Sequence, residues 1–187
     1  NLVNDRSETS TKTGHGGFSG LRVVAFESRR RSDTARLIEK HGGVAVSAPS
    51  LREVALEEDP AILEFARDLL ADCFDAVVFT TGVGAGLLFA AIERAHSREE
   101  LIGALGRVRV VARGPKPLRL LGEMGIEALA AGEPNTWRET LAAMETAGLV
   151  APGSRIAVQE YGLPNPGFVA ALEQRGARVT AVPVYRW

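Results

Sequence analysis

Short apolar runs alternate with longer amphipathic segments from Leu21 onward, and this alternation most constrains the fold. The apolar runs have the length of strands and cover residues 21–26, 44–46, 76–79, 108–112, 127–130, 155–159 and 178–182. Segments with helical spacing of apolar residues lie between most of them, at 32–40, 60–71, 83–95, 117–124, 137–147 and 168–175. Strands that are apolar almost throughout are typical of a parallel sheet buried between helices. The sequence therefore predicts an α/β protein whose parallel sheet has helices on both faces.

Several helix ends are marked by local signals. Pro60 opens the second predicted helix, and Gly42-Gly43 ends the first, which we expect Ser32 or Asp33 to cap. Residues 136–139 (Thr-Trp-Arg-Glu) have the form of a capping box. These signals support the helical assignment of the segments that they bound.

The two ends of the chain indicate a first domain that is incomplete here. Residues 1–20 are polar and predict a flexible tail. The strand–helix–strand unit at 21–46 is too small to bury both of its faces. We expect it to belong to a first domain whose remainder lies beyond Trp187. Residues 47–58 would then leave that domain, 59–181 would form a complete second domain, and 182–187 would return.

The composition excludes several classes of protein. The net charge of −1 over 187 residues argues against nucleic-acid binding by charge alone. The single cysteine, Cys73, excludes an intrachain disulfide framework and a cysteine metal cluster. The absence of an apolar run of about 20 residues argues against a membrane span. We expect a monomer in a reducing cytoplasm, with no direct contact to nucleic acid or membrane.

Turns rich in small residues follow the predicted strands. Ligands of parallel α/β sheets bind outside the carboxyl ends of the strands, where these turns lie. The turns cover 27–32, 80–86, 113–116, 131–136 and 160–167. Free amides and about half a positive charge at helix N-termini would suit a ligand with several phosphates or carboxylates. The alternative is that glycine and proline only separate the elements of an α/β fold.

Residues typical of catalysis are sparse. Gly82-Val83-Gly84 begins like a dinucleotide fingerprint, but the glycine expected at position 87 is Leu87. No histidine pair with metal-ligand spacing is present, and we expect neither a metal nor a cofactor. Tyr161 follows a buried strand, so its hydroxyl is a candidate proton donor in the cleft or else an aromatic lid on the sheet edge. Glu27 and Glu160, at strand ends, are candidate acids.

Four stretches resemble the uroporphyrinogen-III synthase family in their order and spacing. They are residues 79–84 (Phe-Thr-Thr-Gly-Val-Gly), 111–116 (Val-Ala-Arg-Gly-Pro-Lys), 159–162 (Gln-Glu-Tyr-Gly) and 182–186 (Val-Pro-Val-Tyr-Arg). The resemblance implies two α/β domains joined by a two-stranded linker. It also implies a cofactor-free lyase that closes hydroxymethylbilane to uroporphyrinogen III, losing water and inverting the last pyrrole ring. A hydroxymethylbilane synthase would hand over this linear tetrapyrrole.

The resemblance also implies roles for individual residues. Tyr161 would be the acid nearest the departing hydroxyl. The expected substrate-binding residues lie in the turns, and they are Ser28, Arg29, Thr80, Thr81, Gly82, Val83, Gly84, Arg113, Gly114, Lys116, Asn135, Thr136 and Gly162.

Departures from the family pattern leave two alternatives. The first strand ends in Glu27-Ser28-Arg29-Arg30 where many members have Thr-Arg-Pro, and Pro115 and Pro117 remove two amides from one helix start. The 113–116 turn and the 185–187 ending resemble relatives fused to a DNA-binding regulatory domain. A catalytically silent module that senses a tetrapyrrole or another anion is therefore the first alternative. A generic sugar- or phosphate-binding domain is the second.

Overall fold

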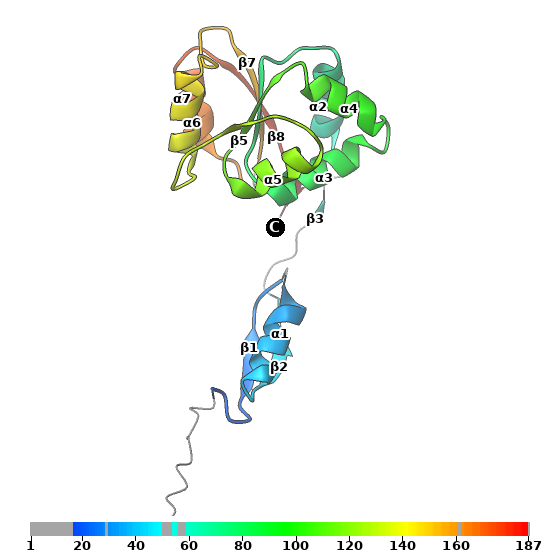
Figure 1. The fold of residues 1–187 in the computed structure, drawn as a ribbon, viewed down its shortest axis with the longest axis vertical. Helices are drawn as coiled ribbons and strands as arrows, with labels where there is room; N and C mark the ends of the chain where they lie inside the picture. Colours follow the sequence, from blue (N-terminus) through cyan, green and yellow to red (C-terminus); the bar gives the residue numbers. More distant parts are fainter. Residues whose placement is uncertain (1–16, 29, 50–53, 56–58, 161, 187) are drawn as a thin grey trace, which may run out of the picture. The chain divides into compact units, whose positions relative to one another are not determined.

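A computed structural model describes residues 17–28, 30–49, 54–55, 59–160 and 162–186 (Figure 1). The chain divides between residues 52 and 53 into two compact units.

The second unit is built on a five-stranded parallel sheet (Figure 1). Its strands are β4 (Ala76–Phe79), β5 (Arg109–Ala112), β6 (Leu129–Ala130), β7 (Arg155–Gln159) and β8 (Arg178–Val182). They lie in the order β6-β5-β4-β7-β8, and every neighbouring pair is parallel. The parallel sheet predicted from the sequence is confirmed.

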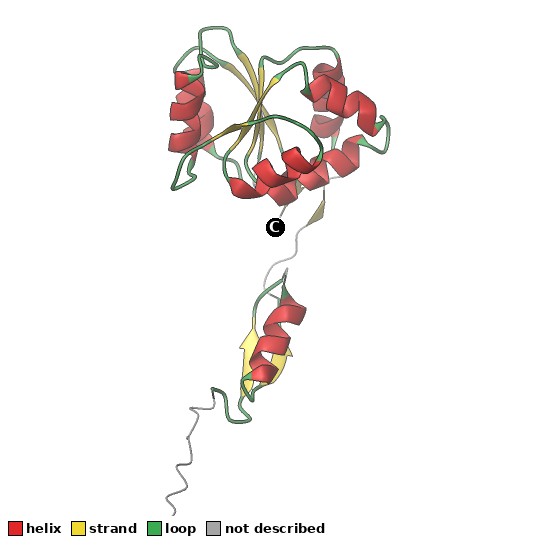
Figure 2. Cartoon of the chain, in the orientation of Figure 1, coloured by secondary structure: helices red, strands yellow, loops and turns green. Residues whose placement is uncertain are grey.

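Helices cover both faces of this sheet (Figure 2). One face carries α2 (Pro60–Leu70), α3 (Gly82–Ile92), α4 (Arg98–Leu105) and α5 (Pro115–Glu123), and the other carries α6 (Trp137–Thr146) and α7 (Pro166–Glu173). Within β4, Val77 and Phe79 pack in the core on the α2–α5 side, whereas Ala76 and Val78 pack in the core beside α6 and α7. Because successive side chains point to opposite faces, a strand covered on both sides must be apolar throughout.

The helix limits agree closely with the sequence signals, with one exception. Asp59 caps α2 directly before Pro60, and the predicted capping box at Thr136 and Glu139 is present. The helix predicted to run to residue 95 ends at Ile92, and a separate helix, α4, follows it. Ser97 begins α4 with a second capping box, in which its N–H donates to the Glu100 carboxylate (2.8 Å) and its hydroxyl accepts from Glu100 N–H (3.1 Å).

The strand order reverses between β4 and β7. From β4 the chain proceeds to β5 and β6 on one side, and then returns to place β7 and β8 on the other. The helices that follow the two central strands, α3 and α7, lie on opposite faces of the sheet. A reversal of this kind opens a crevice outside the carboxyl ends of the two strands, which is where α/β sheets bind ligands.

The first unit consists of β1 (Arg22–Ala25), α1 (Arg31–Lys40) and β2 (Val44–Ser47), with the two strands parallel. Five large apolar side chains are exposed on it, and they are Leu21, Val24, Phe26, Leu37 and Val44. Among the described residues of this unit, Ile38 is the one apolar side chain that is buried.

Two local predictions in the first unit were wrong. The N-cap of α1 is Arg30 and no side chain caps it, so Ser32 and Asp33 lie inside the first turn, where Asp33 pairs with Arg30 (3.1 Å). The end of the predicted tail, residues 17–20, forms a turn, because Phe18 N–H donates to the His41 carbonyl (2.9 Å). Residues 1–16 lie outside the described part of the chain.

A short antiparallel pair joins segments that are far apart in the sequence. β3 (Val54–Ala55) pairs with β9 (Tyr185–Arg186). The pair lies within the two segments that we expect to form the linker between domains. The domain boundaries themselves stay a prediction.

An ion pair fixes β4 against β7 at their amino-terminal ends. The Asp75 carboxylate accepts hydrogen bonds from Arg155 Nη2 (2.8 Å), Arg155 Nε (3.2 Å) and the Arg155 backbone N–H (2.8 Å). The side-chain hydrogen bonds from Arg155, followed by the backbone one, lower the pKa of Asp75. A carboxyl group whose pKa is lower in the folded state stabilises the fold above its unfolded pKa, and this contribution is lost as the pH falls through the folded pKa.

We therefore expect Asp75→Asn to lower Tm at pH 7, because the amide replaces a carboxylate that accepts several hydrogen bonds. The Tm difference from wild type should shrink as the pH falls below about 3.9, the usual unfolded value for aspartate. Thermal unfolding followed by circular dichroism between pH 2.5 and 7 measures both effects. Glu123→Gln, in an exposed helical pair with Arg119 at 3.7 Å, is the control. A difference that does not change with pH would contradict the assignment.

Candidate functional site

The turns that follow β4, β5, β6 and β7 meet at the carboxyl edge of the sheet. Close approaches at glycines show which turns touch. A methyl group on Gly82 would lie 3.0 Å from the Lys116 carbonyl oxygen, and one on Gly114 would lie 3.4 Å from Asn135 Cβ. A methyl group on Gly84 would lie only 2.2 Å from Gln159 Nε2. The structure therefore brings the sequence-predicted turns of the second unit together.

A buried polar network joins the ends of the two central strands. Gln159 is 1% exposed, and its Oε1 accepts from the backbone N–H groups of Thr80 and Thr81, each at 3.2 Å. The Thr80 hydroxyl donates to the Gln159 carbonyl oxygen at 2.8 Å. Thr80 is itself buried, so its hydroxyl is engaged inside the protein. Of the two threonines, Thr81 is the one that lies partly exposed at the crevice.

The N-terminus of α3 offers backbone amides to the crevice. The Thr81 hydroxyl caps the helix by accepting from Gly84 N–H at 3.0 Å. Among the described residues, neither the Gly82 nor the Val83 N–H donates a backbone hydrogen bond. Val83 is 41% exposed. Two free amides at the positive end of a helix are suited to an anionic group.

The neighbouring turns add positive charge and polar side chains. Lys116 is exposed in the first turn of α5, and Arg113 precedes that helix. Asn135 adopts a left-handed backbone conformation (φ 63°) beside Gly114. The hydroxyl of Thr136 contacts Glu139 and caps α6, so it is used within the helix terminus. Lys116 and Asn135 are thus polar side chains that these turns place at the carboxyl edge, with Arg113 in the same turn as Lys116.

The turn after β7 contributes a carboxyl group. Glu160 is half-buried, and its N–H donates to the Val182 carbonyl at 2.9 Å. Burial raises the pKa of Glu160, and a hydrogen bond from the Asn165 backbone opposes this shift. Gly162, two residues further on, has a left-handed φ of 62°. Tyr161 lies between them but outside the described residues, so its role as the acid stays a prediction.

Two predicted residues belong to the first unit. Ser28 is partly exposed after β1, and Arg29 lies outside the described residues. Their part in the site stays a prediction.

Sequence reasoning did not assign Gln159 and Trp137 to the site. Gln159 is the last residue of β7 and follows three apolar residues, and a polar residue at that position was the available signal. Trp137 begins α6, packs near Phe168 (ring centroids 6.2 Å apart), and carries the Arg138 guanidinium 4.6 Å from its ring centroid. The contact of its ring with Phe168 therefore connects the start of α6 with the start of α7 beside the crevice.

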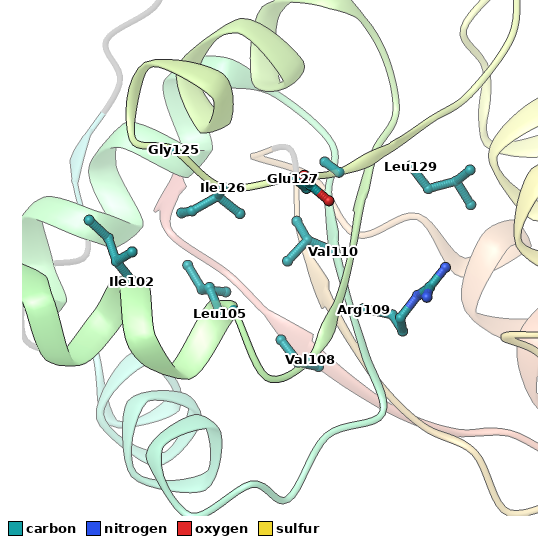
Figure 3. A pocket seen from close by; sticks show the side chains of 11 residues that line it. Ile102, Leu105, Val108, Arg109, Val110, Gly125, Ile126, Glu127 and Leu129 are labelled. Atoms are coloured by element: carbon teal, nitrogen blue, oxygen red, sulfur yellow. The ribbon is translucent and has the colours of Figure 1, made fainter.

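A pocket lies at the opposite edge of the sheet, near the amino-terminal ends of β5 and β6 (Figure 3). Its volume is about 590 Å³, and apolar side chains such as Leu105, Val110 and Ile126 line it together with Arg109 and Glu127. None of the predicted site residues lines this pocket. Among the described residues, no three His, Cys, Asp or Glu side chains cluster to hold a metal ion. No described helix is long and apolar enough to cross a membrane.

A doubly wound parallel sheet with a crevice at its strand-order reversal defines a class of α/β ligand-binding proteins. Comparison with known proteins shows to which family within this class the chain belongs. The sequence model of the family described as "Uroporphyrinogen-III synthase HemD" matches residues 32–187. The chain belongs to the uroporphyrinogen-III synthase family.

Individual relatives are similar to this chain over most of its length. The chain is 31% identical over 173 residues to "Uncharacterized protein YjjA" of Bacillus subtilis (strain 168), covering 91% of this chain and 62% of that protein. A mutant uroporphyrinogen III synthase from Thermus thermophilus is 30% identical with a TM-score of 0.66, and the wild-type crystal gives a TM-score of 0.60. Each match covers 89% of this chain and 62% of the Thermus chain. The chain thus spans less than two thirds of the length of these relatives.

The raised pKa of Glu160 predicts how this residue affects stability. An acid whose pKa is higher in the folded state costs stability as the pH rises through that pKa, whereas below the unfolded pKa of about 4.3 the cost is absent. Glu160→Gln should therefore raise Tm at pH 7 and leave it nearly unchanged at pH 4. Differential scanning calorimetry at both values, with Glu173→Gln on the exposed end of α7 as control, measures this. An equal change at both pH values would show that burial does not disfavour the Glu160 charge.

Proposed function

We propose that this chain is the larger part of a uroporphyrinogen-III synthase, a lyase of tetrapyrrole biosynthesis. The substrate would be hydroxymethylbilane, supplied by a hydroxymethylbilane synthase. The reaction would remove the terminal hydroxyl as water, invert the last pyrrole ring and close the macrocycle. Membership of the family and the similarity to the Thermus enzymes support this proposal.

One observation in the structure carries the proposal: the turns after four neighbouring strands adjoin at the strand-order reversal. They offer the amides of Gly82 and Val83 and the side chains of Lys116, Arg113 and Asn135. The substrate's acetate and propionate groups are carboxylates, which amides at a helix start and basic side chains stabilise. Several such contacts on one edge would hold a flexible linear substrate in a single arrangement.

The chemistry demands little from the protein beyond orientation and one proton. The departing hydroxyl accepts a proton as its C–O bond breaks, and ring closure then returns a proton from the attacking pyrrole carbon. Tyr161 is our candidate for the first donor, and Glu160 lies next to it in the sequence. Holding the two ends of the substrate together would supply much of the rate, since intramolecular orientation removes a large entropic barrier.

The direct test is to incubate the full-length protein with hydroxymethylbilane and separate the isomers of the product after oxidation. Uncatalysed closure gives isomer I, so we expect isomer III only with the protein present. Isomer I as the sole product would exclude the lyase activity of this chain. Binding of the linear tetrapyrrole without isomer III would instead favour the sensing module.

We expect Tyr161→Phe to slow isomer III formation by about 100-fold, the usual contribution of general acid catalysis. Tyr185→Phe removes the hydroxyl of the buried tyrosine in β9 and is the control. The initial rate of isomer III formation measures both variants. A Tyr161→Phe rate equal to wild type would remove Tyr161 from the acid role.

A further inference from the structure

The carboxamide of Gln159 is buried and its hydrogen-bonding groups are engaged. Its Oε1 lies 3.2 Å from each of the Thr80 and Thr81 backbone nitrogens and 3.4 Å from the Thr80 hydroxyl. Its Nε2 donates to the carbonyl oxygen of Glu160. Gln159 is one of three buried polar residues among those described, beside Thr80 and Thr140. A buried polar group of this kind is costly unless it is satisfied, so its partners hold it in one position.

The contacts of Gln159 connect the two sides of the crevice. Thr80 and Thr81 lead from β4 into α3, whereas Glu160 leads from β7 toward α7. The side chain therefore spans the point at which the strand order reverses. It also occupies the Thr80 and Thr81 amides, which leaves the Gly82 and Val83 amides as the donors that the turn presents outward.

Gly84 provides the space that this side chain needs. A methyl group on Gly84 would lie 2.2 Å from Gln159 Nε2 and 2.6 Å from its Cδ, and Gly84 is buried. Gly86 is in the same helix, but a methyl group there would meet only Leu120 Cδ2, at 3.9 Å. A side chain at position 84 would thus collide with Gln159, whereas a methyl group at position 86 would meet no close neighbour.

We propose that Gln159 is a positioning residue: it fixes the turn after β4 against the turn after β7, so that the Gly82 and Val83 amides face an anionic ligand at a set distance from Glu160. Gly84 is the complementary half of this arrangement. The proposal rests on the proposed function only for the class of ligand, a polycarboxylate tetrapyrrole. The hydrogen-bonding role itself does not depend on turnover.

The test compares wild type with Gly84→Ala, Gln159→Leu, the double variant Gly84→Ala/Gln159→Ala, and Gly86→Ala as the matched glycine control. Three properties are measured on the chain: Tm, NMR hydrogen exchange of the Thr80 and Thr81 amides, which donate to Gln159 Oε1, and the Kd for uroporphyrin from quenching of tryptophan fluorescence. Binding and exchange are measured well below the lowest Tm. Uroporphyrin is a stable polycarboxylate, so the binding measurement needs no catalysis.

We expect Gly84→Ala and Gln159→Leu to weaken uroporphyrin binding by about tenfold, the loss of roughly one charge-assisted hydrogen bond. Exchange at the Thr80 and Thr81 amides should quicken in both, because Gln159 Oε1 is their acceptor. Gly86→Ala should behave as wild type in binding and exchange. The double variant removes the steric conflict, so its Tm should rise above that of Gly84→Ala, while its binding stays weak.

Recovery of binding together with Tm in the double variant would overturn the proposal, because Gln159 would then act only through packing. Wild-type binding and exchange in Gln159→Leu would overturn it as well. Failure of the proposed function gives a different result. If wild type neither binds uroporphyrin nor forms isomer III while the exchange changes occur as expected, the ligand assignment falls and the positioning of the turn stands.

Discussion

The hydrogen bonds of the Gln159 carboxamide hold together the part of the fold on which the site depends. The parallel sheet reverses its strand order between β4 and β7, and α3 and α7 diverge to opposite faces from this point. Such a divergence creates a crevice, but the backbone groups at the bottom of it must still find partners. Gln159 supplies them for Thr80 and Thr81. The placement of the turn after β4 against the end of β7 therefore depends on how one buried polar side chain is satisfied.

The two central strands are fastened differently at their two ends. The amino-terminal ends are joined by the Asp75–Arg155 ion pair, whose side chains are about half exposed. The carboxyl ends are joined by a neutral carboxamide. A buried carboxylate in the place of Gln159 would oppose an anionic ligand and would itself be costly to ionise. The neutral carboxamide adds no negative charge there. The electrostatic potential of the crevice is then set by the positive end of α3 and by Lys116 and Arg113.

The sequence alone predicted the helices and strands that are marked by a local pattern of apolar residues. β7 and β8 occupy the predicted residues, and α2 begins at Pro60 as expected, because an apolar strand and a proline at a helix start are unambiguous signals. The predicted helix at 83–95 ran three residues past the end of α3, and α4 was not predicted. Residues 93–97 carry no proline or glycine, and the break there depends on the Ser97 capping box. The ordered turn at residues 17–20 was missed because its hydrogen bonds reach across to residues near 41.

The turns of the candidate site could be predicted from the sequence, but the hydrogen bonds that connect them could not. Strand–turn–helix alternation fixes which residues lie at the carboxyl edge, so the sequence alone placed residues 80–84, 113–116 and 135–136 there as candidate site residues. The role of Gln159 depends on contacts with residues 78 and 79 positions earlier in the chain. No local pattern encodes such contacts. For the same reason the burial of Thr80, which removes its hydroxyl from the crevice, was not apparent from the sequence.

The most direct measurement is a titration of the isotopically labelled chain with uroporphyrin, followed residue by residue through backbone amide chemical shifts. The account predicts that the largest changes fall at residues 81–84, 114, 116, 135–136 and 162, at the carboxyl edge of the sheet. Residues 105–110 and 125–129, which include the lining of the pocket in Figure 3, should not respond. Changes concentrated at that pocket, with an unperturbed carboxyl edge, would contradict the account.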